Sequence, residues 1–521
     1  MNYQTAEQIY SKCEGDRNSY LDRARTASKL TLPYIMPEEG FGVSSRLDTP
    51  FAGVGARGVN NLASKLLLAL LPPNAPFFRL NIDSFAIKEE GADEALISEI
   101  EKSLQQVEET VMNEISQQSY RVGVHEALKQ LVVTGNALIY LPEEGGMRVF
   151  HLDRYVIKRD PMGNVIKIAT KETVSYETLS DEIKQASLAS GKAPSEECEL
   201  FTTCLREDNK WHMYQDINGV RIPETEGTFD IDKSPFIALR FSKIDGEDYG
   251  RGYVEEYLGD LQSLESLTQA IVEGSAIAAK TLFLVNPNGT TRGKVLAEAD
   301  NGAIVQGNAA DVTVLQTQKA NDFRVAQETI NVIKDRLGQA FLLTSGVVRN
   351  AERVTAEEIR MLSQELESAL GGLYSLLSNE LQLPLVNRLL ATLNKNKKLP
   401  KLPKDVVNPV IITGVEALGR GNDLHKLDLF LAGAAQIVGA EAVAQFVNVN
   451  EYFARRATAL GIKTDGLIKD AEAMQAEQQQ AQQMQLLQKA APAGVKALAD
   501  TVNDPDVRAE MKEQQPQGFK T

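Results

Sequence analysis

A short glycine-rich segment has the residue spacing of a nucleotide-binding loop. The segment from Gly53 to Gly58 reads GVGARG, which matches the pattern G-x-G-x-x-G and leads into a helical sequence. In dinucleotide-binding proteins these glycines directly follow a strand and belong to a βαβ unit that holds a pyrophosphate. Here the preceding residues, LDTPF at 47–51, include a proline. A flexible entry to a helix is therefore the favoured interpretation, and a nucleotide-dependent enzyme is kept as an alternative.

Other residue types that catalyse reactions or bind metals show no working arrangement. Neither a G-x-x-x-x-G-K-[ST] loop nor a G-x-S-x-G elbow occurs, so an ATP-driven motor and a serine hydrolase both lack an anchor. The three cysteines cannot form a disulfide framework, and no pair has metal-knuckle spacing. The histidines are scattered: His125, His151, His212 and His425. The sequence predicts a protein that is not an enzyme and has no cofactor and no metal site.

Carboxylates gather on one side of a long helical sequence between residues 253 and 280. An apolar stripe runs along this segment, and no basic residue occurs before its end. Its other face carries five acidic residues: Glu255, Glu256, Asp260, Glu265 and Glu273. Acid–base catalysis and metal binding fit this pattern less well than two interpretations that stay open. One is a solvated helix face, and the other is the lining of a pore, where fixed negative charge repels a sliding polyanion.

The overall composition excludes several classes of protein. The chain has 521 residues, and 71 acidic against 55 basic residues give a net charge of −16, which excludes a generally basic nucleic-acid binder. At roughly 150 residues per domain, three or four structural units are expected. No signal peptide is expected, because the N-terminus has no basic region followed by an apolar one. The apolar stretch 429–440 is shorter than the ~20 residues of a membrane span, so no membrane partner is expected.

Helical and strand patterns alternate in the first half of the chain. The spacing of apolar residues predicts four helices and one strand, in the order 5–30, 57–71, 77–82 (the strand), 92–118 and 122–133. From 136 to about 242 the apolar period changes to two, with turn-rich breaks. This region is expected to be mainly antiparallel sheet, with one helix around 177–190.

Two long helices bracket a small insert in the centre of the chain. Residues 253–280 predict one helix roughly 42 Å long, and 321–343 a second of roughly 34 Å, at about 1.5 Å per residue. Between them, the runs LFLV, KVL, AIV and VTVL predict a β-rich module over 281–319. The arrangement predicts a stalk of two antiparallel helices with a module at its tip.

A polar loop and more helices follow the stalk. Thr355 and Glu358 form the capping box of a helix that is expected to run to about Leu383, before a proline. A small helical unit is expected within 424–470. The glutamine-rich sequence beyond it either continues a helix or is disordered.

Several segments resemble the portal, or head-to-tail connector, protein of podovirus-type short-tailed bacteriophages. They are YGRGYVEEYLGDL at 249–261, LVNPNG at 284–289, and TAEEIR at 355–360 through LGGLY at 370–374. The resemblance covers nearly the whole chain in segment order and length, and it is most specific over 249–390. It implies an α+β, helix-rich viral portal fold.

The resemblance also implies a division of the chain. In order, the parts are a mixed α/β wing (1–248), a first stem helix (249–280), a small β-containing clip (281–319), a second stem helix (320–344), the tunnel loop (345–354), a return helix of the wing with its connection (355–423), a helical crown (424–470) and the glutamine-rich tail (471–521). The tail matches no pattern of the family.

In function, the resemblance implies a ring of about twelve copies at a unique capsid vertex. Double-stranded DNA would enter through it during packaging and leave during ejection, and the ring would initiate procapsid assembly. The implied partners are the terminase large subunit, the tail adaptor protein, scaffolding protein, the major capsid protein and internal core proteins. The implied location is the virion, and the host cytoplasm during assembly. A channel-less helical scaffold protein is the second alternative.

Within the tunnel loop, Arg349, Asn350 and Arg353 are the residues expected to contact DNA. The two arginines are the only basic residues of 345–354. Phosphate contacts are individually weak and salt-dependent, which suits a grip that has to release. The five carboxylates of the first stem helix would form an acidic channel lining.

Overall fold

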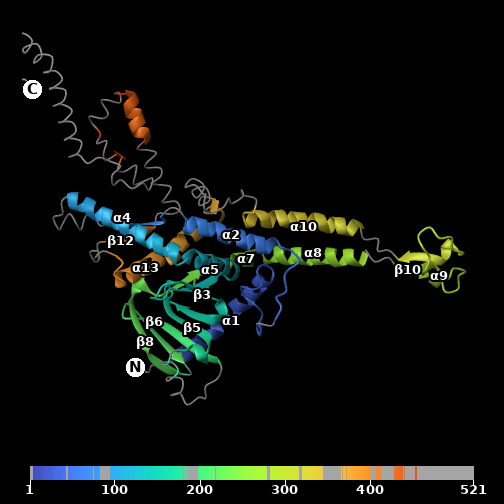
Figure 1. The fold of residues 1–521 in the computed structure, drawn as a ribbon, viewed down its shortest axis with the longest axis horizontal. Coiled ribbons are helices and arrows are strands. Elements are labelled where there is room, and N and C mark those ends of the chain that lie inside the picture. Colours follow the sequence, from blue (N-terminus) through green and yellow to red (C-terminus); the bar gives the residue numbers. More distant parts are fainter. Residues whose placement is uncertain are drawn as a thin grey trace, which may run out of the picture. The chain divides into compact units, whose positions relative to one another are not determined.

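The chain divides into two compact units, Met1–Ala417 and Leu418–Thr521. Wing, stem and clip all belong to the first (Figure 1). The computed structural model describes residues 4–42, 45–73, 76–82, 94–179, 181, 184, 197–217, 219–278, 282–315, 320–343, 365–366, 368–370, 372–399, 407–411, 428–437, 439, 447 and 452–453.

A five-stranded antiparallel sheet forms the β-rich part of the wing. Its strands lie side by side in chain order: β4 (Tyr155–Arg159), β5 (Val165–Ser175), β6 (Glu197–Glu207), β7 (Lys210–Ile217) and β8 (Val220–Asp230). This confirms the predicted antiparallel region, but the sequence pattern does not predict β8, because Pro223 and Gly227 interrupt its period. In the described sheet β8 is an edge strand, where a proline is tolerated because no neighbouring strand needs its missing N–H.

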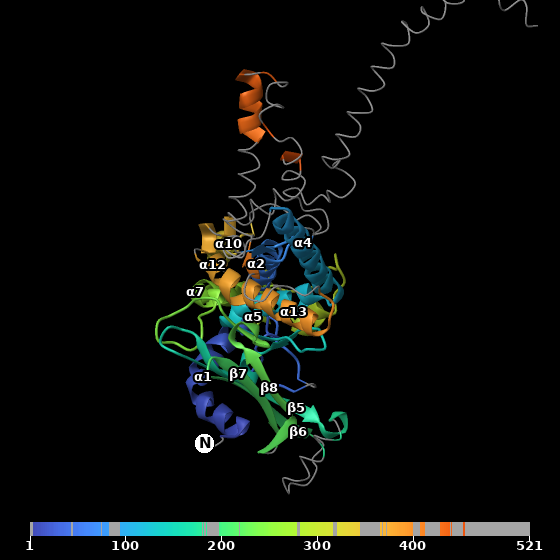
Figure 2. The ribbon, with the colours of Figure 1, turned by 90° about the vertical axis from the view of Figure 1, so that its left-hand side faces the viewer.

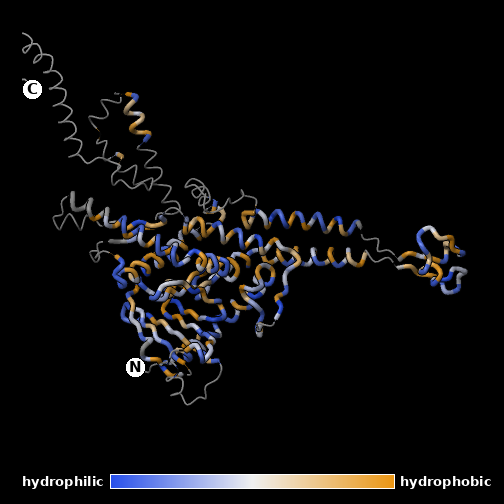
Figure 3. The backbone as a smooth tube through the Cα atoms, viewed as in Figure 1, coloured by the Kyte–Doolittle hydropathy of each residue, from blue (hydrophilic) through white to orange (hydrophobic). Residues whose placement is uncertain are grey.

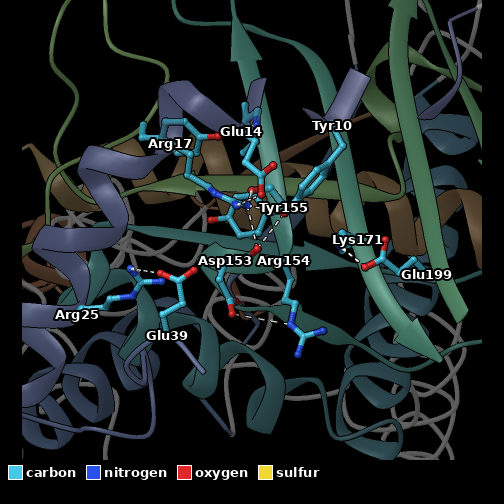
Figure 4. Close-up of polar contacts among 12 residues, drawn as sticks. Tyr10, Glu14, Arg17, Arg25, Glu39, Asp153, Arg154, Tyr155, Lys171 and Glu199 are labelled. Carbon is cyan, nitrogen blue, oxygen red and sulfur yellow. Dashed lines mark hydrogen bonds and ion pairs between the residues drawn. The ribbon is translucent and has the colours of Figure 1, made fainter. Parts of the chain in front are cut away.

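Helix α1 (Ala6–Lys29) covers one face of this sheet (Figure 2). The buried guanidinium of Arg17 joins the two layers (Figure 4). Its Nη1 donates to the Tyr10 hydroxyl (2.8 Å) and to the carbonyl oxygens of Asp153 (2.9 Å) and Tyr155 (2.7 Å). Hydrogen bonds from a charged donor are strong ones. Three such bonds fix the position of α1 on the start of β4.

The rest of the wing is built from helices and short strands. It consists of α2 (Val54–Leu70), β1 (Phe78–Ile82), α4 (Glu94–Gln117), α5 (Tyr120–Thr134), β2 (Asn136–Tyr140), β3 (Arg148–Phe150) and β9 (Phe236–Arg240). The middle strand β2 pairs antiparallel with β3 and β9, and α5 packs against both α2 and β2. The predicted helices and strand of the first 133 residues are confirmed, with ends shifted by a few residues.

Short helical turns connect the wing strands. They are the 3-10 turns η1 (Leu152–Arg154), η2 (Tyr176–Thr178) and η3 (Ile231–Lys233). Of the helix predicted around 177–190, η2 and the helical residues at 181 and 184 are described, and the remainder lies outside the described residues.

The stem and clip follow the predicted order with three corrections. The elements are α7 (Tyr253–Glu256), α8 (Leu258–Ala278), β10 (Leu282–Val285), α9 (Gly293–Ala297), η4 (Ala309–Asp311), β11 (Val312–Leu315) and α10 (Ala320–Ala340). The single helix expected over 253–280 is interrupted at Tyr257. β10 and β11 pair antiparallel as predicted, but KVL lies in helix α9 and AIV forms no strand. Three-residue apolar runs do not distinguish a helix from a strand.

The return helix of the wing does not end before Pro384 as expected. It continues through α12 (Leu373–Leu377), a π-helical turn η6 (Ser378–Gln382) and α13 (Leu383–Lys395). Pro384 lies in the first turn of α13, directly after η6, and it contributes no N–H to the helical hydrogen bonds. The capping box of Thr355 and Glu358 lies outside the described residues.

Two side chains of this return helix bind the C-terminal end of α2. The Tyr374 hydroxyl donates to the Ala69 carbonyl (3.0 Å), and Gln382 Nε2 donates to the Leu70 carbonyl (2.6 Å). Helix ends leave carbonyl groups without intrahelical partners, so these bonds both cap α2 and attach the return helix. The chain then closes the wing with β12 (Val407–Ile411), which pairs antiparallel with β1.

In the second unit, residues 428–437 are helical, within the range expected for the crown. The Tyr452 hydroxyl donates to the Asp428 carboxylate (2.6 Å). Residues 439, 447, 452 and 453 are also described, whereas the remainder of 424–470 and the whole tail lie outside the described part. Among the described helices, none has the length and apolarity needed to cross a bilayer.

Candidate functional site: the stem and its junction with the wing

The two stem helices run antiparallel and contact each other along their length. Near the wing, Arg336 Nη1 of α10 donates to Asp260 Oδ1 of α8 (2.8 Å). Near the clip, the Phe323 ring of α10 packs on Gly274 of α8, where an added Cβ would lie 2.7 Å from the ring. The start of α8 thus faces the end of α10, as the predicted stalk requires.

The stem buries its apolar side chains only near the wing. Leu261, Leu264, Ile330, Ile333 and Leu337 are buried there. Side chains at least half exposed to solvent include Val272, Ile277 and Val325 farther out, and Val332 at the level of the buried Ile330 and Ile333. Helix α8 is also the more apolar of the two, with three charged residues against six in α10 (Figure 3). A helix that is apolar on several sides requires neighbours on several sides.

Three of the five predicted lining carboxylates contact groups outside their own helix. Glu265 accepts the backbone N–H groups of Phe51 (2.8 Å) and Ala52 (2.9 Å), which hold the chain entering α2. Asp260 accepts from Arg336, as described above. Glu255 pairs with Arg251 (3.1 Å) and with Arg23 of α1 (3.3 Å). The contacts of Glu265 and Glu255 attach the stem to the wing, and the contact of Asp260 joins the two stem helices.

A network of charged groups surrounds Glu255 at the base of the stem. Arg251 also pairs with Glu247 (2.9 Å), which accepts a hydrogen bond from the Tyr20 hydroxyl (2.7 Å). The hydrogen bond from Arg251 lowers the pKa of Glu247. Burial, followed by the bond to Glu247, raises the pKa of Tyr20 to about 12. Sequence reasoning missed this network, although Glu247, Arg251 and Glu255 have the i,i+4 spacing of helical ion pairs.

The other two predicted lining residues, Glu256 and Glu273, are exposed. Glu273 accepts a hydrogen bond from Gln269 of the same helix (2.8 Å). Partial burial and then the adjacent Glu255 charge raise the pKa of the Glu256 carboxyl. The acidic lining stays a prediction, and these two side chains are its most accessible members.

Close backbone contacts join the stem to the wing at the YGRGY sequence. A Cβ added at Gly250 would lie 2.7 Å from the Gly135 carbonyl oxygen, and one at Gly252 would lie 2.5 Å from the Val133 carbonyl oxygen. Between them, Asn136 donates to the Gly250 carbonyl (2.9 Å) and accepts its N–H (2.7 Å). Both glycines are therefore explained by the approach of the 249–253 segment to the end of α5.

An aromatic cluster occupies the same junction. The Tyr253 ring centroid lies 5.4 Å from that of Phe241, 5.2 Å from that of Tyr257 and 5.6 Å from that of Phe341. The Tyr253 hydroxyl donates to the Ala340 carbonyl at the end of α10 (2.8 Å). Both stem helices therefore meet the wing through one packed group of rings.

The G-x-G-x-x-G segment is explained by packing. In the described residues it follows an irregular chain, with Gly53 at the N-cap of α2. A Cβ at Gly55 would lie 2.5 Å from the Leu30 carbonyl oxygen, and one at Gly58 would lie 2.6 Å from the Phe341 ring. The close approach of these neighbours accounts for both glycines without a bound nucleotide.

The described residues offer little other chemistry. No group of three or more His, Cys, Asp or Glu side chains among them could hold a metal ion. A polar groove of about 670 Å³ lies between α1 and residues 34–41 and is lined by side chains of both signs. His151, which lines this groove, has its Nδ1 atom 2.7 Å from the Ile35 carbonyl oxygen. The described lining contains no Ser, Thr or Cys that could act as a nucleophile beside this histidine. The tunnel-loop residues Arg349, Asn350 and Arg353 lie outside the described residues.

The clip presents apolar side chains around a small ordered turn. Asp311 Oδ2 accepts the N–H groups of Thr290 (2.8 Å) and Thr291 (3.1 Å), and hydrogen bonds from Thr291 and Thr290 lower the pKa of this carboxyl. Several large apolar side chains of the clip are exposed: Phe283, Leu284, Val295, Ile304 and Val314. Phe283 and Val314 are direct partners in the β10–β11 pair, and contiguous exposed apolar groups are typical of a binding surface.

The sequence matches the family described as bacteriophage head to tail connecting protein over residues 3–468. It is 40% identical over 503 residues to the portal protein of Escherichia phage T7, covering 95% of this chain and 93% of that one. It is 41% identical to the portal protein of Enterobacteria phage T3, covering 95% and 92%. A chain from the neck of a native gene transfer agent particle is 11% identical, over 80% of this chain and 91% of that chain, with a TM-score of 0.33.

Proposed function

This chain belongs to the bacteriophage head-to-tail connecting protein family, and on that premise we infer that it serves as a portal: a structural component of the virion neck at a capsid vertex, through which DNA passes. One observation on the chain itself carries this inference. Two antiparallel helices leave the wing side by side and carry a small β-containing module at their ends. A wall of such helix pairs around an axis makes a channel.

The portal is proposed to be a closed ring of about twelve copies. The exposed apolar side chains of the stem support this proposal, because Val272 and Ile277 on α8 and Val325 and Val332 on α10 are at least half exposed within the described subunit. In a head-to-tail ring, each stem has a neighbour on both sides. Burying these groups between stems would remove them from water and stabilise the ring.

The channel is proposed to repel DNA rather than bind it tightly. Glu256 and Glu273 are the accessible carboxylates of the proposed lining, and the intrasubunit contacts of Glu255, Asp260 and Glu265 reduce their contribution to it. At physiological salt the repulsion is screened beyond about 8 Å. A duplex near the channel axis would therefore meet weak repulsion from a lining several ångströms away.

The clip is proposed to dock first the terminase large subunit and then the tail adaptor protein. Its exposed apolar side chains support a protein partner at this end of the stem. Scaffolding protein, the major capsid protein and internal core proteins are proposed to contact the wing and crown. Assembly is proposed to begin in the host cytoplasm, with the ring as initiator of the procapsid.

Imaging of the purified chain tests the ring directly. Negative-stain micrographs are expected to show rings with a central hole, and Val332→Asp should shift them to smaller species because it places a charge between stems. The matched control is Met162→Asp, at an exposed turn between β4 and β5. Filaments or monomers of the unmodified chain would contradict the portal proposal and favour a channel-less scaffold protein.

Replacing both Arg349 and Arg353 with alanine tests the proposed DNA contacts of the tunnel loop. Rings should still form, but the DNA retained in assembled particles should decrease, because each arginine contributes a salt-dependent phosphate contact. The measurement is packaged-genome yield at two salt concentrations. An unchanged yield in the double variant would remove these residues from the proposed function.

A further inference from the structure

One face of α2 contacts the C-terminal end of the second stem helix, α10. Gly58, Asn61 and Lys65 lie three and four residues apart and therefore share one side of α2. Gly58 leaves room for the Phe341 ring, and Asn61 Nδ2 donates to the carbonyl oxygens of Phe341 (2.9 Å) and Leu342 (3.0 Å). The last turn of α10 is thus attached to α2 by shape and by hydrogen bonds.

The chain leaves α10 in a conformation that its neighbours must hold. The Leu343 N–H donates to the Gly338 carbonyl (2.7 Å) and the Leu342 N–H to the Gln339 carbonyl (3.1 Å), which is the Schellman pattern of helix ends. Leu342 has φ 53°, in the left-handed region that favours glycine. A leucine stays there only where the surrounding structure fixes it.

Lys65 contacts both sides of the segment that follows. Its ammonium group is almost fully buried, with 2% of the side chain exposed. Nζ donates to the Leu342 carbonyl (3.2 Å) and pairs with Glu365 Oε2 (3.3 Å). Leu342 precedes residues 343–364 and Glu365 follows them. A positive charge at the C-terminal end of α10 is also favoured by the helix dipole.

We propose that Lys65 is a positioning residue that ties both ends of the 343–364 segment to one point on α2. Stability gives little reason for a lysine here, because apolar side chains of similar volume often replace a buried ion pair without loss. The ion pair of Lys65 with Glu365 and its hydrogen bond to the Leu342 carbonyl together select one arrangement of Leu342 and Glu365. The functional meaning of the tie rests on the proposed DNA contacts of the tunnel loop, but the tie itself does not.

Hydrogen exchange on the assembled full-length protein tests the tie. In Lys65→Met, peptides covering 338–343 and 365–370 should exchange on the order of ten times faster, because Leu342 and Glu365 are released from α2. Peptides of α8 should be unchanged. The control is Lys158→Met, which breaks the pair of Lys158 with Asp248 (2.7 Å) elsewhere in the wing.

A second variant keeps the test decisive if Lys65→Met fails to fold. Glu365→Gln removes only the charge of a residue with a third of its side chain exposed, and it should accelerate exchange in the same peptides. Unchanged exchange in 338–343 and 365–370 in the folded variants would overturn the proposal. Faster exchange with normal DNA retention would keep the tie and instead count against the proposed DNA contacts of the loop.

Discussion

Replacing Phe341 with alanine is expected to lower the free energy of unfolding by about 3–5 kcal/mol. The side chain is fully buried, packs on Gly58 and contacts the rings of Tyr253 and Tyr257. Its removal would leave a cavity where α2, α7 and the end of α10 meet, and neither stem helix could close it without leaving the wing. Chemical denaturation followed by the fluorescence of Trp211 measures the change.

Phe283→Ala is the matched control for this cavity. Phe283 loses the same atoms but is 60% exposed on β10, so its replacement should change the free energy of unfolding by about 0.5 kcal/mol or less. Similar losses in the two variants would show that Phe341 does not hold the junction together.

Replacing Gly135 with alanine is expected to lower the free energy of unfolding by about 3 kcal/mol or more, or to prevent folding. Gly135 ends α5 with φ 79°, and an added Cβ would lie 2.4 Å from the backbone carbon of Arg251 and from the backbone nitrogen of Gly252. Two main chains meet there, so relief requires moving the whole 249–253 segment. That movement would also break the bonds between Asn136 and Gly250.

The control Gly246→Ala separates this contact from backbone strain. Gly246 has φ 76°, almost the same conformation, but no atom lies within 4 Å of its added Cβ. This variant should lower the free energy of unfolding by only about 1–2 kcal/mol, which is the cost of an alanine in the left-handed region. Equal midpoints of urea unfolding in the two variants would mean that the close approach adds nothing.

Sequence periodicity predicted most elements because their burial follows from one face of each helix or strand. It failed where the deciding force came from elsewhere in the chain. Residues 253–278 keep an apolar stripe across the break at Tyr257, since the break follows from aromatic packing on Phe341, far away in sequence. Strand β8 tolerates Pro223 because it lies at the edge of its sheet, a position that sequence spacing does not reveal.

The candidate site shows the same limit. Residue types located the acidic face of the stem, but not the partners of its carboxylates, since Arg23, Phe51 and Arg336 come from three distant segments. The glycines of 53–58 have a motif-like spacing, and only the packed neighbours of Gly55 and Gly58 reveal their role. The resemblance named these segments stem and clip from their order in the sequence rather than from single contacts.

The pairing of β1 with β12 has a consequence for how the chain folds during synthesis. Phe78 pairs with Ile411, so the wing cannot close until the stem, clip and return helix have all been made. At about 5–20 residues per second, the ribosome needs on the order of 20–60 s to reach β12 after β1. Meanwhile β4 to β8 can pair locally, because each strand follows its neighbour in the chain. Strand β1 therefore has no partner strand among the described residues until β12 has been synthesised.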